Sequence, residues 1–456
     1  MPELLIGWAS RDITPSRPVM LKGQWHVRVS THAEDPLTVT ALALETVGCD
    51  EPEQAVLVSC DLLCIPGQLQ EKVRDRIRKH LSELNPLKLF LNATHTHTAP
   101  EIEEGWYPHP GGNVMTPAEY TNFLVERIAE AVVEAWNGRR TGGVSWALSH
   151  AVVGHNRRVT YFSGNSEMYG KTDDPNFDHI EGYEDHTIEM LFTWSPSERL
   201  TGLILNLACP AQTVESENYV SADFWHDIRK EIRRRHSPDL FVLPQCSAAG
   251  DQSPHLLLYN RAEADVRKRR GVTERQEIAD RVANALDHVL KAAQSEIHTE
   301  IPIWHCVETL KLPLRRLSHD DFNKAKEYVR LNEQKSNAPG RLFFEKRVLN
   351  RYQMQESPNP PTSCPVELHV LRLGDVAMAT NPFELFLDYG LRIKARSRAL
   401  QTFVIQLACD CALYLPTERA VKAGGYGAEV LVSDVGPEGG QVLVNRTIEL
   451  INGMWF

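Results

Sequence analysis

A short apolar run that ends in two closely spaced histidines constrains the fold of this chain more than any other feature. Residues 88–91 predict a buried strand, which leads into the loop Asn92-Ala93-Thr94-His95-Thr96-His97-Thr98-Ala99-Pro100. Because side-chain direction alternates along a strand, His95 and His97 point to the same side. Loops at strand ends are where α/β sheets bind ligands, and neutral imidazole both ligates metals and carries protons. The two histidines could both bind a metal, both carry protons in an acid–base step, or take one role each. Taken alone, the motif also fits a pair of surface histidines without a function.

Strands and helices alternate along the rest of the chain, but not strictly. Apolar stretches predict strands over residues 41–46, 55–63, 143–153, 188–194, 200–207, 240–243, 301–314, 366–373, 376–380 and 403–409. Amphipathic spacing predicts helices over residues 68–84, 117–136, 222–235, 274–293 and 320–334. The polar stretch 160–183 predicts a long loop, and Pro382-Phe383-Glu384 predicts the start of a further helix. Because several strand pairs have no helix between them, we expect an α/β fold with mixed sheets and covering helices.

Charge and cysteine usage exclude several classes of protein. The formal net charge of -11 and the pI near 5.9 argue against nucleic-acid binding and against adhesion to anionic membranes. No apolar run approaches the ~20 residues that span a bilayer, and the N-terminal residues show no signal-peptide pattern. The nine cysteines are scattered, as is typical of reduced cytosolic proteins. We therefore expect a cytoplasmic protein that acts on a small-molecule substrate, with an oligomeric state that the sequence leaves open.

Short motifs with unusual chemistry lie at predicted strand or helix ends over nearly the whole chain. They are Asp12-Ile13-Thr14-Pro15, His95-Thr96-His97-Thr98-Ala99-Pro100, Asn156-Arg157, Ala248-Ala249-Gly250-Asp251-Gln252-Ser253-Pro254, Asn381-Pro382-Phe383-Glu384, and Tyr414-Leu415-Pro416-Thr417 followed by Tyr426. In this combination and order the motifs resemble those of the neutral/alkaline non-lysosomal ceramidases. The resemblance implies a single large catalytic domain of that type over residues 1–456, without the family's C-terminal immunoglobulin-like domain, for which the chain has no room.

The resemblance also implies a zinc-dependent amidase. Ceramidases hold their metal with two histidines, a glutamate and a tyrosine. By motif, His95 matches the first histidine ligand, Glu384 the carboxylate and Tyr414 the tyrosine. Zinc with an open coordination position lowers the pKa of bound water to about 7 and polarises a carbonyl, which suits the hydrolysis of an amide.

The fourth ligand is where the sequence departs from the family. The other ceramidase histidine lies in a segment like Asn-x-Ala-x-His-Pro, whereas this chain has Asn206-Leu207-Ala208-Cys209-Pro210-Ala211-Gln212 and no histidine. Three outcomes remain open. Cys209 ligates the metal as a thiolate; another group such as His97, His226 or Asp223 takes the place; or the site binds metal weakly or not at all. We favour a retained site in which Cys209 is the fourth ligand.

Further residues acquire catalytic roles by the same resemblance. His97 matches the histidine that faces the substrate carbonyl, and a positioned histidine can pass a proton to a leaving amine. Arg157 and Tyr426 match the groups that steady the carbonyl oxygen, and donors of this kind stabilise a developing oxyanion. Ser253, close to Asp251, matches a serine once cast as the nucleophile.

These patterns lead to one main hypothesis and two alternatives. The main hypothesis is a metal-dependent hydrolase, with zinc-activated water attacking an amide carbonyl; the substrate is a lipid amide or a soluble amide, ester or sugar derivative. The first alternative is a metal-free serine hydrolase on the same scaffold, with Ser253 as nucleophile and His97 as base. The second alternative is a binding protein without catalysis, which the loss of histidine near Cys209 keeps open.

Overall fold

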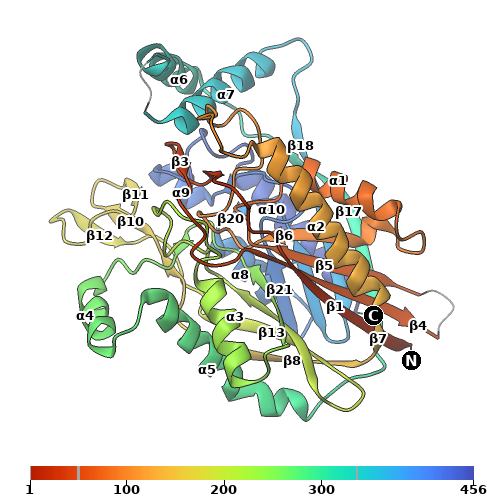
Figure 1. The fold of residues 1–456 in the computed structure, drawn as a ribbon. Helices are drawn as coiled ribbons and strands as arrows, with labels where there is room; N and C mark the ends of the chain where they lie inside the picture. Colours follow the sequence, from red (N-terminus) through yellow and green to blue (C-terminus); the bar gives the residue numbers. More distant parts are fainter. Residues whose placement is uncertain (1, 49–51, 335–336, 456) are drawn as a thin grey trace.

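Three sheets form the body of the computed structural model, which describes residues 2–48, 52–334 and 337–455 (Figure 1). The first sheet has the strand order β6-β5-β4-β1-β7. Its strands are β1 (Glu3–Asp12), β4 (Thr38–Val47), β5 (Gln54–Cys60), β6 (Leu89–Ala93) and β7 (Arg140–Thr141). Most neighbours are antiparallel, but β5 and β6 run parallel. The parallel pair is joined through α1 (Gly67–Arg78), and α2 (Pro117–Asn137) packs on α1, β1 and β4.

The second and third sheets are also mixed. The second has the order β15-β14-β13-β8 and the third β17-β18-β19-β21, and each ends in a parallel pair. Their strands are β8 (Gly143–His150), β13 (Thr187–Trp194), β14 (Leu200–Leu207), β15 (Phe241–Cys246), β17 (Ile303–Pro313), β18 (Ser363–Leu373), β19 (Val376–Thr380) and β21 (Gln401–Ile405). Helices α3 (Phe224–Arg235) and α5 (Glu274–Gln294) cover the second sheet, and α8 (Leu387–Arg396) and α10 (Pro437–Gly453) cover the third. The expected α/β fold with mixed sheets and covering helices is confirmed.

One hydrophobic core joins the three sheets. Its buried side chains include Leu57 and Phe90 from the first sheet, Leu191 from the second, and Met378 and Phe403 from the third. Complete burial of a side chain of this size contributes about 1.5–3 kcal/mol. Because all three sheets contribute to the same core, the loops at their ends are held in fixed positions relative to one another.

Small sheets and additional helices complete the chain. The small sheets are β2–β3 (Met20–Leu21, Arg28–Val29), β9–β16 (His155–Asn156, Gln252–Ser253), β10–β11–β12 (Arg158–Tyr161, Ser166–Met168, Phe177–Ile180) and β20–β22 (Glu384–Leu385, Tyr414–Leu415). The remaining helices are η1 (Pro86–Lys88), α4 (Asn260–Arg270), α6 (His319–Asn332), α7 (Pro339–Gln355) and α9 (Glu418–Ala423). Helices α6 and α7 pack on each other and form a lobe above the sheets (Figure 1).

Two of our local expectations are wrong. Residues 160–183 are not a simple loop, because β10 pairs with β11 and β12 as a three-stranded antiparallel sheet. The helix expected from Pro382 begins only at Leu387, because Glu384 and Leu385 pair with Tyr414 and Leu415 as parallel strands. In both places hydrogen bonds formed by folding outweigh local sequence preference.

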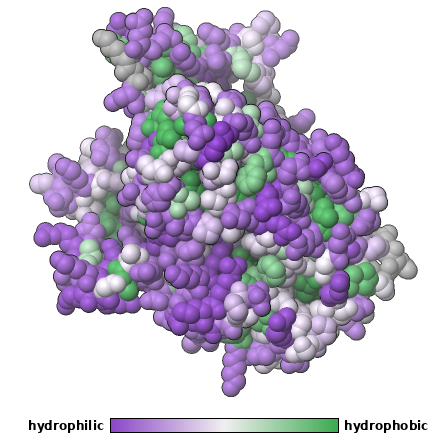
Figure 2. Space-filling model, viewed as in Figure 1, coloured by the Kyte–Doolittle hydropathy of each residue, from purple (hydrophilic) through white to green (hydrophobic). Residues whose placement is uncertain are grey.

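The surface agrees with the composition of the chain. The face shown in Figure 2 is mostly hydrophilic, and hydrophobic residues appear on it as separate patches. Among the residues described, no helix combines the length and the apolar character needed to cross a bilayer. The eight cysteines in the described ranges are free thiols, and Cys49 lies outside those ranges.

Candidate functional site

His95 lies in the loop directly after β6, in an unusual backbone conformation. Its φ is 65°, a left-handed value that non-glycine residues rarely adopt and that often marks functional sites. The backbone N–H of His95 donates to the Leu62 carbonyl at 2.9 Å, and its Nδ1 lies 2.8 Å from the Leu63 carbonyl oxygen. A carbonyl can only accept, so Nδ1 carries the proton in the neutral ring. The lone pair of Nε2 therefore points into the site, toward Glu384 and His97.

Glu384 and Tyr414 reach His95 from the paired strands β20 and β22. The two residues are direct neighbours in the parallel register, and the backbone N–H of Glu384 donates to the Leu413 carbonyl at 2.8 Å. Glu384 Oε2 lies 3.4 Å from His95 Nε2, and the Tyr414 hydroxyl hydrogen-bonds the Glu384 carboxylate. The structure thus brings together the three residues that we predicted as metal ligands, although hundreds of positions separate His95 from the other two.

Arg157, the residue between β9 and β10, completes this group. Its Nη2 donates to the Tyr414 hydroxyl at 3.1 Å and to the Gly250 carbonyl at 2.9 Å. Burial by itself would lower the pKa of Arg157, but Tyr414, Tyr169 and Glu384 outweigh burial and raise it well above its ordinary value. Burial would raise the pKa of Glu384, but His95, Tyr414 and Arg157 lower it overall. The site therefore holds a fixed guanidinium beside a carboxylate that stays ionised.

His97 lies beside His95 and is held as a neutral ring. Its Nε2 is 3.3 Å from His95 Nε2 and 2.6 Å from Gln212 Nε2. Burial is the main cause that lowers the pKa of His97 well below its ordinary value, and His95, Arg28 and Arg157 add to it. Because the Gln212 amide donates to Nε2, that nitrogen of His97 is an acceptor.

Gln212 is the residue of the site that sequence reasoning missed. Its Nε2 contacts His97, and its Oε1 accepts from Arg157 Nη1 at 3.3 Å. It lies two positions beyond Pro210, in the segment 206–212 that we expected to supply the fourth ligand. The available signal was that Gln212 is the one residue with an amide side chain among positions 207–212.

Cys209 and Ser253 lie apart from this group. Cys209 Sγ is directed to the carbonyl oxygens of Val153 at 3.7 Å and Pro210 at 3.4 Å, and burial raises the pKa of its thiol well above the ordinary value. Ser253 Oγ is fully buried and accepts hydrogen bonds from the Tyr169 hydroxyl at 3.0 Å and from the His255 backbone at 3.1 Å. Neither side chain lines the cavity that His95 and Glu384 face.

The other residues named for the open ligand position have structural contacts. Asp223 begins α3 and accepts hydrogen bonds from Thr213 and from the backbone of Val214 and Phe224. His226 lies on the same helix and does not line the cavity. Asp251 accepts from the Leu387 backbone at 2.8 Å and from Asn156 at 3.0 Å, so it fixes the start of α8.

A cavity of about 330 Å³ lies in front of these residues. Aromatic side chains form much of its wall, and Tyr426 links two of them, with its ring centroid 5.5 Å from Tyr414 and 5.7 Å from Trp25. Helix α7 contributes Phe344 from the lobe above the sheets. Charged walls are supplied by Lys22 and Glu215. The arrangement can enclose a small ligand and present it to an imidazole, a carboxylate, a phenol and a guanidinium.

Comparison with known proteins assigns the fold. No protein-family model and no curated protein sequence matches the chain. Among solved structures, the neutral ceramidase from Pseudomonas aeruginosa matches with a TM-score of 0.71 at 16% identity, over 100% of this chain and 75% of that one. A structure of a ceramidase complexed with C2 matches with a TM-score of 0.70 at 15% identity, with the same coverage. The chain therefore has a neutral ceramidase-type fold.

Proposed function

We propose that this protein is a metal-dependent hydrolase of amide bonds, with zinc as the metal. One observation carries the proposal: His95 Nε2 lies 3.4 Å from Glu384 Oε2, with the Tyr414 hydroxyl bonded to the same carboxylate. The Leu63 carbonyl accepts a hydrogen bond from Nδ1–H of His95. In the neutral ring, the lone pair of His95 Nε2 therefore faces a lone pair of Glu384 Oε2. A cation between them resolves the repulsion. Binding of the other ring nitrogen to a backbone carbonyl is also how metal-ligating histidines are oriented.

The residues present therefore fit a zinc ion held by His95, Glu384 and Tyr414. When bound, zinc supplies a Lewis acid that polarises a carbonyl and activates water. We do not include Cys209 among the ligands, because its Sγ is directed away from the group. The polar side chain that reaches the site from residues 206–212 is Gln212, which binds Arg157 and His97.

Other side chains of the site could stabilise charge and transfer protons during the reaction. Arg157 is a fixed cation 3.1 Å from the Tyr414 hydroxyl, where it can stabilise negative charge that develops on a carbonyl oxygen, and Tyr426 adds a second phenol near this position. His97 is neutral and its Nε2 accepts from the Gln212 amide, so it can accept a proton there and return it to the leaving amine once the substrate displaces that amide. The aromatic walls exclude water and hold the substrate in place.

The cavity indicates a small substrate. A volume of about 330 Å³ is at the low end of ligand pockets in proteins. Trp25, Trp106 and Phe344 suit an apolar portion of the substrate, and Lys22 and Glu215 suit polar groups. We therefore expect a compact amide that carries both an apolar and a polar portion.

Metal analysis combined with an amidase assay tests the proposal. The purified chain should contain zinc, and a strong chelator should abolish hydrolysis of short N-acyl amides, with recovery after zinc is returned. Activity that is unaffected by the chelator would contradict the metal-dependent mechanism. A fluorophosphonate that labels Ser253 under those conditions would instead support the serine mechanism.

A further inference from the structure

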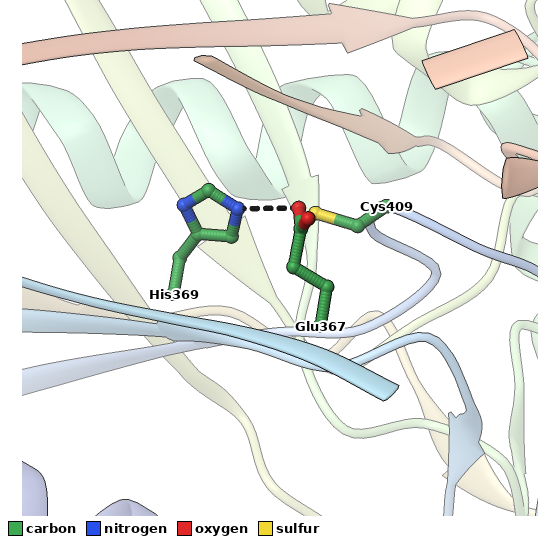
Figure 3. A group of neighbouring side chains, drawn as sticks. All are labelled: Glu367, His369 and Cys409. Atoms are coloured by element: carbon green, nitrogen blue, oxygen red, sulfur yellow. Dashed lines mark hydrogen bonds and ion pairs between the residues drawn. The ribbon is translucent and has the colours of Figure 1, made fainter. Parts of the chain in front are cut away.

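A second group of potential metal ligands lies away from the cavity. Glu367 and His369 are two residues apart on β18, so their side chains lie on the same face of the strand. Cys409 lies in the loop after β21 (Figure 3). Their ligand atoms, a carboxylate oxygen, an imidazole nitrogen and a thiol sulfur, all lie within 4.8 Å of one another. None of the three lines the cavity in front of His95. The group is therefore separate from the proposed catalytic site.

A chain of hydrogen bonds leads into this group and contains too few protons. His305 Nδ1 lies 3.0 Å from the Gln54 carbonyl oxygen, and His305 Nε2 lies 2.9 Å from His369 Nδ1. His369 Nε2 lies 2.7 Å from Glu367 Oε1. Each of these three contacts needs one N–H, but two neutral imidazoles carry only two. With the Gln54 carbonyl and the contact between the rings satisfied, the lone pair of His369 Nε2 faces a carboxylate oxygen.

An additional proton is a poor solution at this position. It would create an imidazolium among buried groups, next to Arg74, whose guanidinium already binds both Glu367 oxygens at 2.7 and 2.8 Å. His369 and His305 are both buried, so an added proton would place a charge away from water. A metal cation satisfies the same lone pairs, and the thiolate that Cys409 would supply offsets part of its charge.

We propose that Glu367, His369 and Cys409 bind a structural divalent cation of the zinc class. One nitrogen, one carboxylate oxygen and one sulfur form a donor set that suits zinc better than magnesium or calcium. His305 and the Gln54 carbonyl would orient His369 in the way that outer groups orient zinc-bound histidines. Binding through the Cys409 sulfur must displace the thiol proton into solvent, because the thiolate is the form that ligates the metal.

The position of the group suggests what this cation would stabilise. Cys409 begins the segment that leads to Tyr414, and its backbone N–H donates to the Leu91 carbonyl of β6 at 3.1 Å. A cation shared with Glu367 and His369 would tie this segment to the third sheet. It would thereby fix the backbone on which Tyr414 reaches the catalytic site.

Cobalt substitution tests the proposal on the chain of residues 1–456. Loading of the metal-free protein with Co²⁺ should give a thiolate-to-cobalt charge-transfer band in the near ultraviolet. The band should persist in Glu384→Gln, which alters only the proposed catalytic ligands. It should also persist in Cys364→Ser, a control that removes a half-buried thiol from β18, the strand that carries Glu367 and His369. It should disappear in Cys409→Ser, together with about one equivalent of zinc per chain by elemental analysis.

Three results would overturn the proposal. The first is the absence of a thiolate band in the cobalt-loaded wild-type chain, a measurement that does not depend on the folding of any variant. The second is a band and a zinc content that are the same in Cys409→Ser as in the wild type. His369→Gln provides a second variant, and retention of its zinc content at the wild-type level would count in the same way.

Discussion

The two groups of proposed metal ligands in this protein have a similar arrangement but differ in their access to solvent. In each, a backbone carbonyl fixes the proton of a histidine, directly at His95 and through His305 at His369, and the free nitrogen then faces a glutamate. The His95 group opens onto a cavity of about 330 Å³, whereas the His369 group lines no part of that cavity. Zinc sites that keep a free position carry out catalysis, and closed sites stabilise structure. The comparison thus supports the catalytic role that we propose for the first group and the structural role that we propose for the second.

The largest expected effect is on activity and comes from His95→Asn. Asparagine tolerates the left-handed backbone at this position, so the variant should fold. Loss of a proposed ligand removes several kcal/mol of transition-state stabilisation, which corresponds to a decrease in kcat/KM on the order of 10³-fold or more. An amidase assay with zinc analysis measures the effect.

The control for this substitution is His32→Asn, because His32 is exposed and lies outside the cavity. It should keep wild-type activity and zinc content. Equal activity in His95→Asn and His32→Asn would show that His95 has no part in the mechanism. The proposed contrast between a catalytic and a structural metal group would then be wrong.

Arg157→Lys should have the next largest effect on activity. Lysine keeps a positive charge, but its single nitrogen cannot keep both the Nη2 contacts to Tyr414 and Gly250 and the Nη1 contact to the Gln212 oxygen. Loss of one donor to a developing oxyanion typically reduces kcat by about 10²–10³-fold. Steady-state kinetics should show the loss mainly in kcat. A loss confined to KM would mean that Arg157 binds the substrate without stabilising the transition state.

Unlike the two preceding variants, Cys409→Ser should lower the stability of the protein more than its activity. If the second group holds a cation at about a hundred times its dissociation constant, loss of that cation removes about 2.7 kcal/mol from the free energy of unfolding. Thermal or urea denaturation with and without zinc measures this difference. Cys364→Ser should respond to zinc as the wild type does, and an identical zinc response in Cys409→Ser would argue against a structural metal.

The sequence predicts most of the regular elements that position the site. The apolar run before His95 is β6, and the Thr116 cap with Glu119 begins α2 as a capping box. Helix α4 was not predicted because none of its residues is buried, so that it lacks an apolar stripe. The strand position of Glu384 depends on pairing with Tyr414, a contact that local sequence does not encode.

Side-chain direction in loops explains what was missed within the site. Ungapped comparison with the ceramidase motif puts Pro210 at the ligand position, and the thiol of Cys209 immediately before it suggests a ligand by its chemistry. The backbone of residues 207–212 instead turns Cys209 toward Val153 and brings Gln212 to Arg157. Residue type alone gave no reason to prefer Gln212, because an amide is a weaker metal ligand than a thiolate.

The smallest expected effect comes from Gln212→Ala. This variant tests whether Gln212 takes the place of a second histidine ligand beside His95, Glu384 and Tyr414. Gln212 bridges Arg157 and His97 through hydrogen bonds of 3.3 and 2.6 Å. Loss of one such bond to a charged group costs about 1.5 kcal/mol, or roughly tenfold in kcat/KM. Zinc content should stay at the wild-type level if Gln212 only positions its neighbours. Loss of zinc from Gln212→Ala, but not from the exposed control Gln441→Ala, would instead make Gln212 a ligand of the catalytic metal.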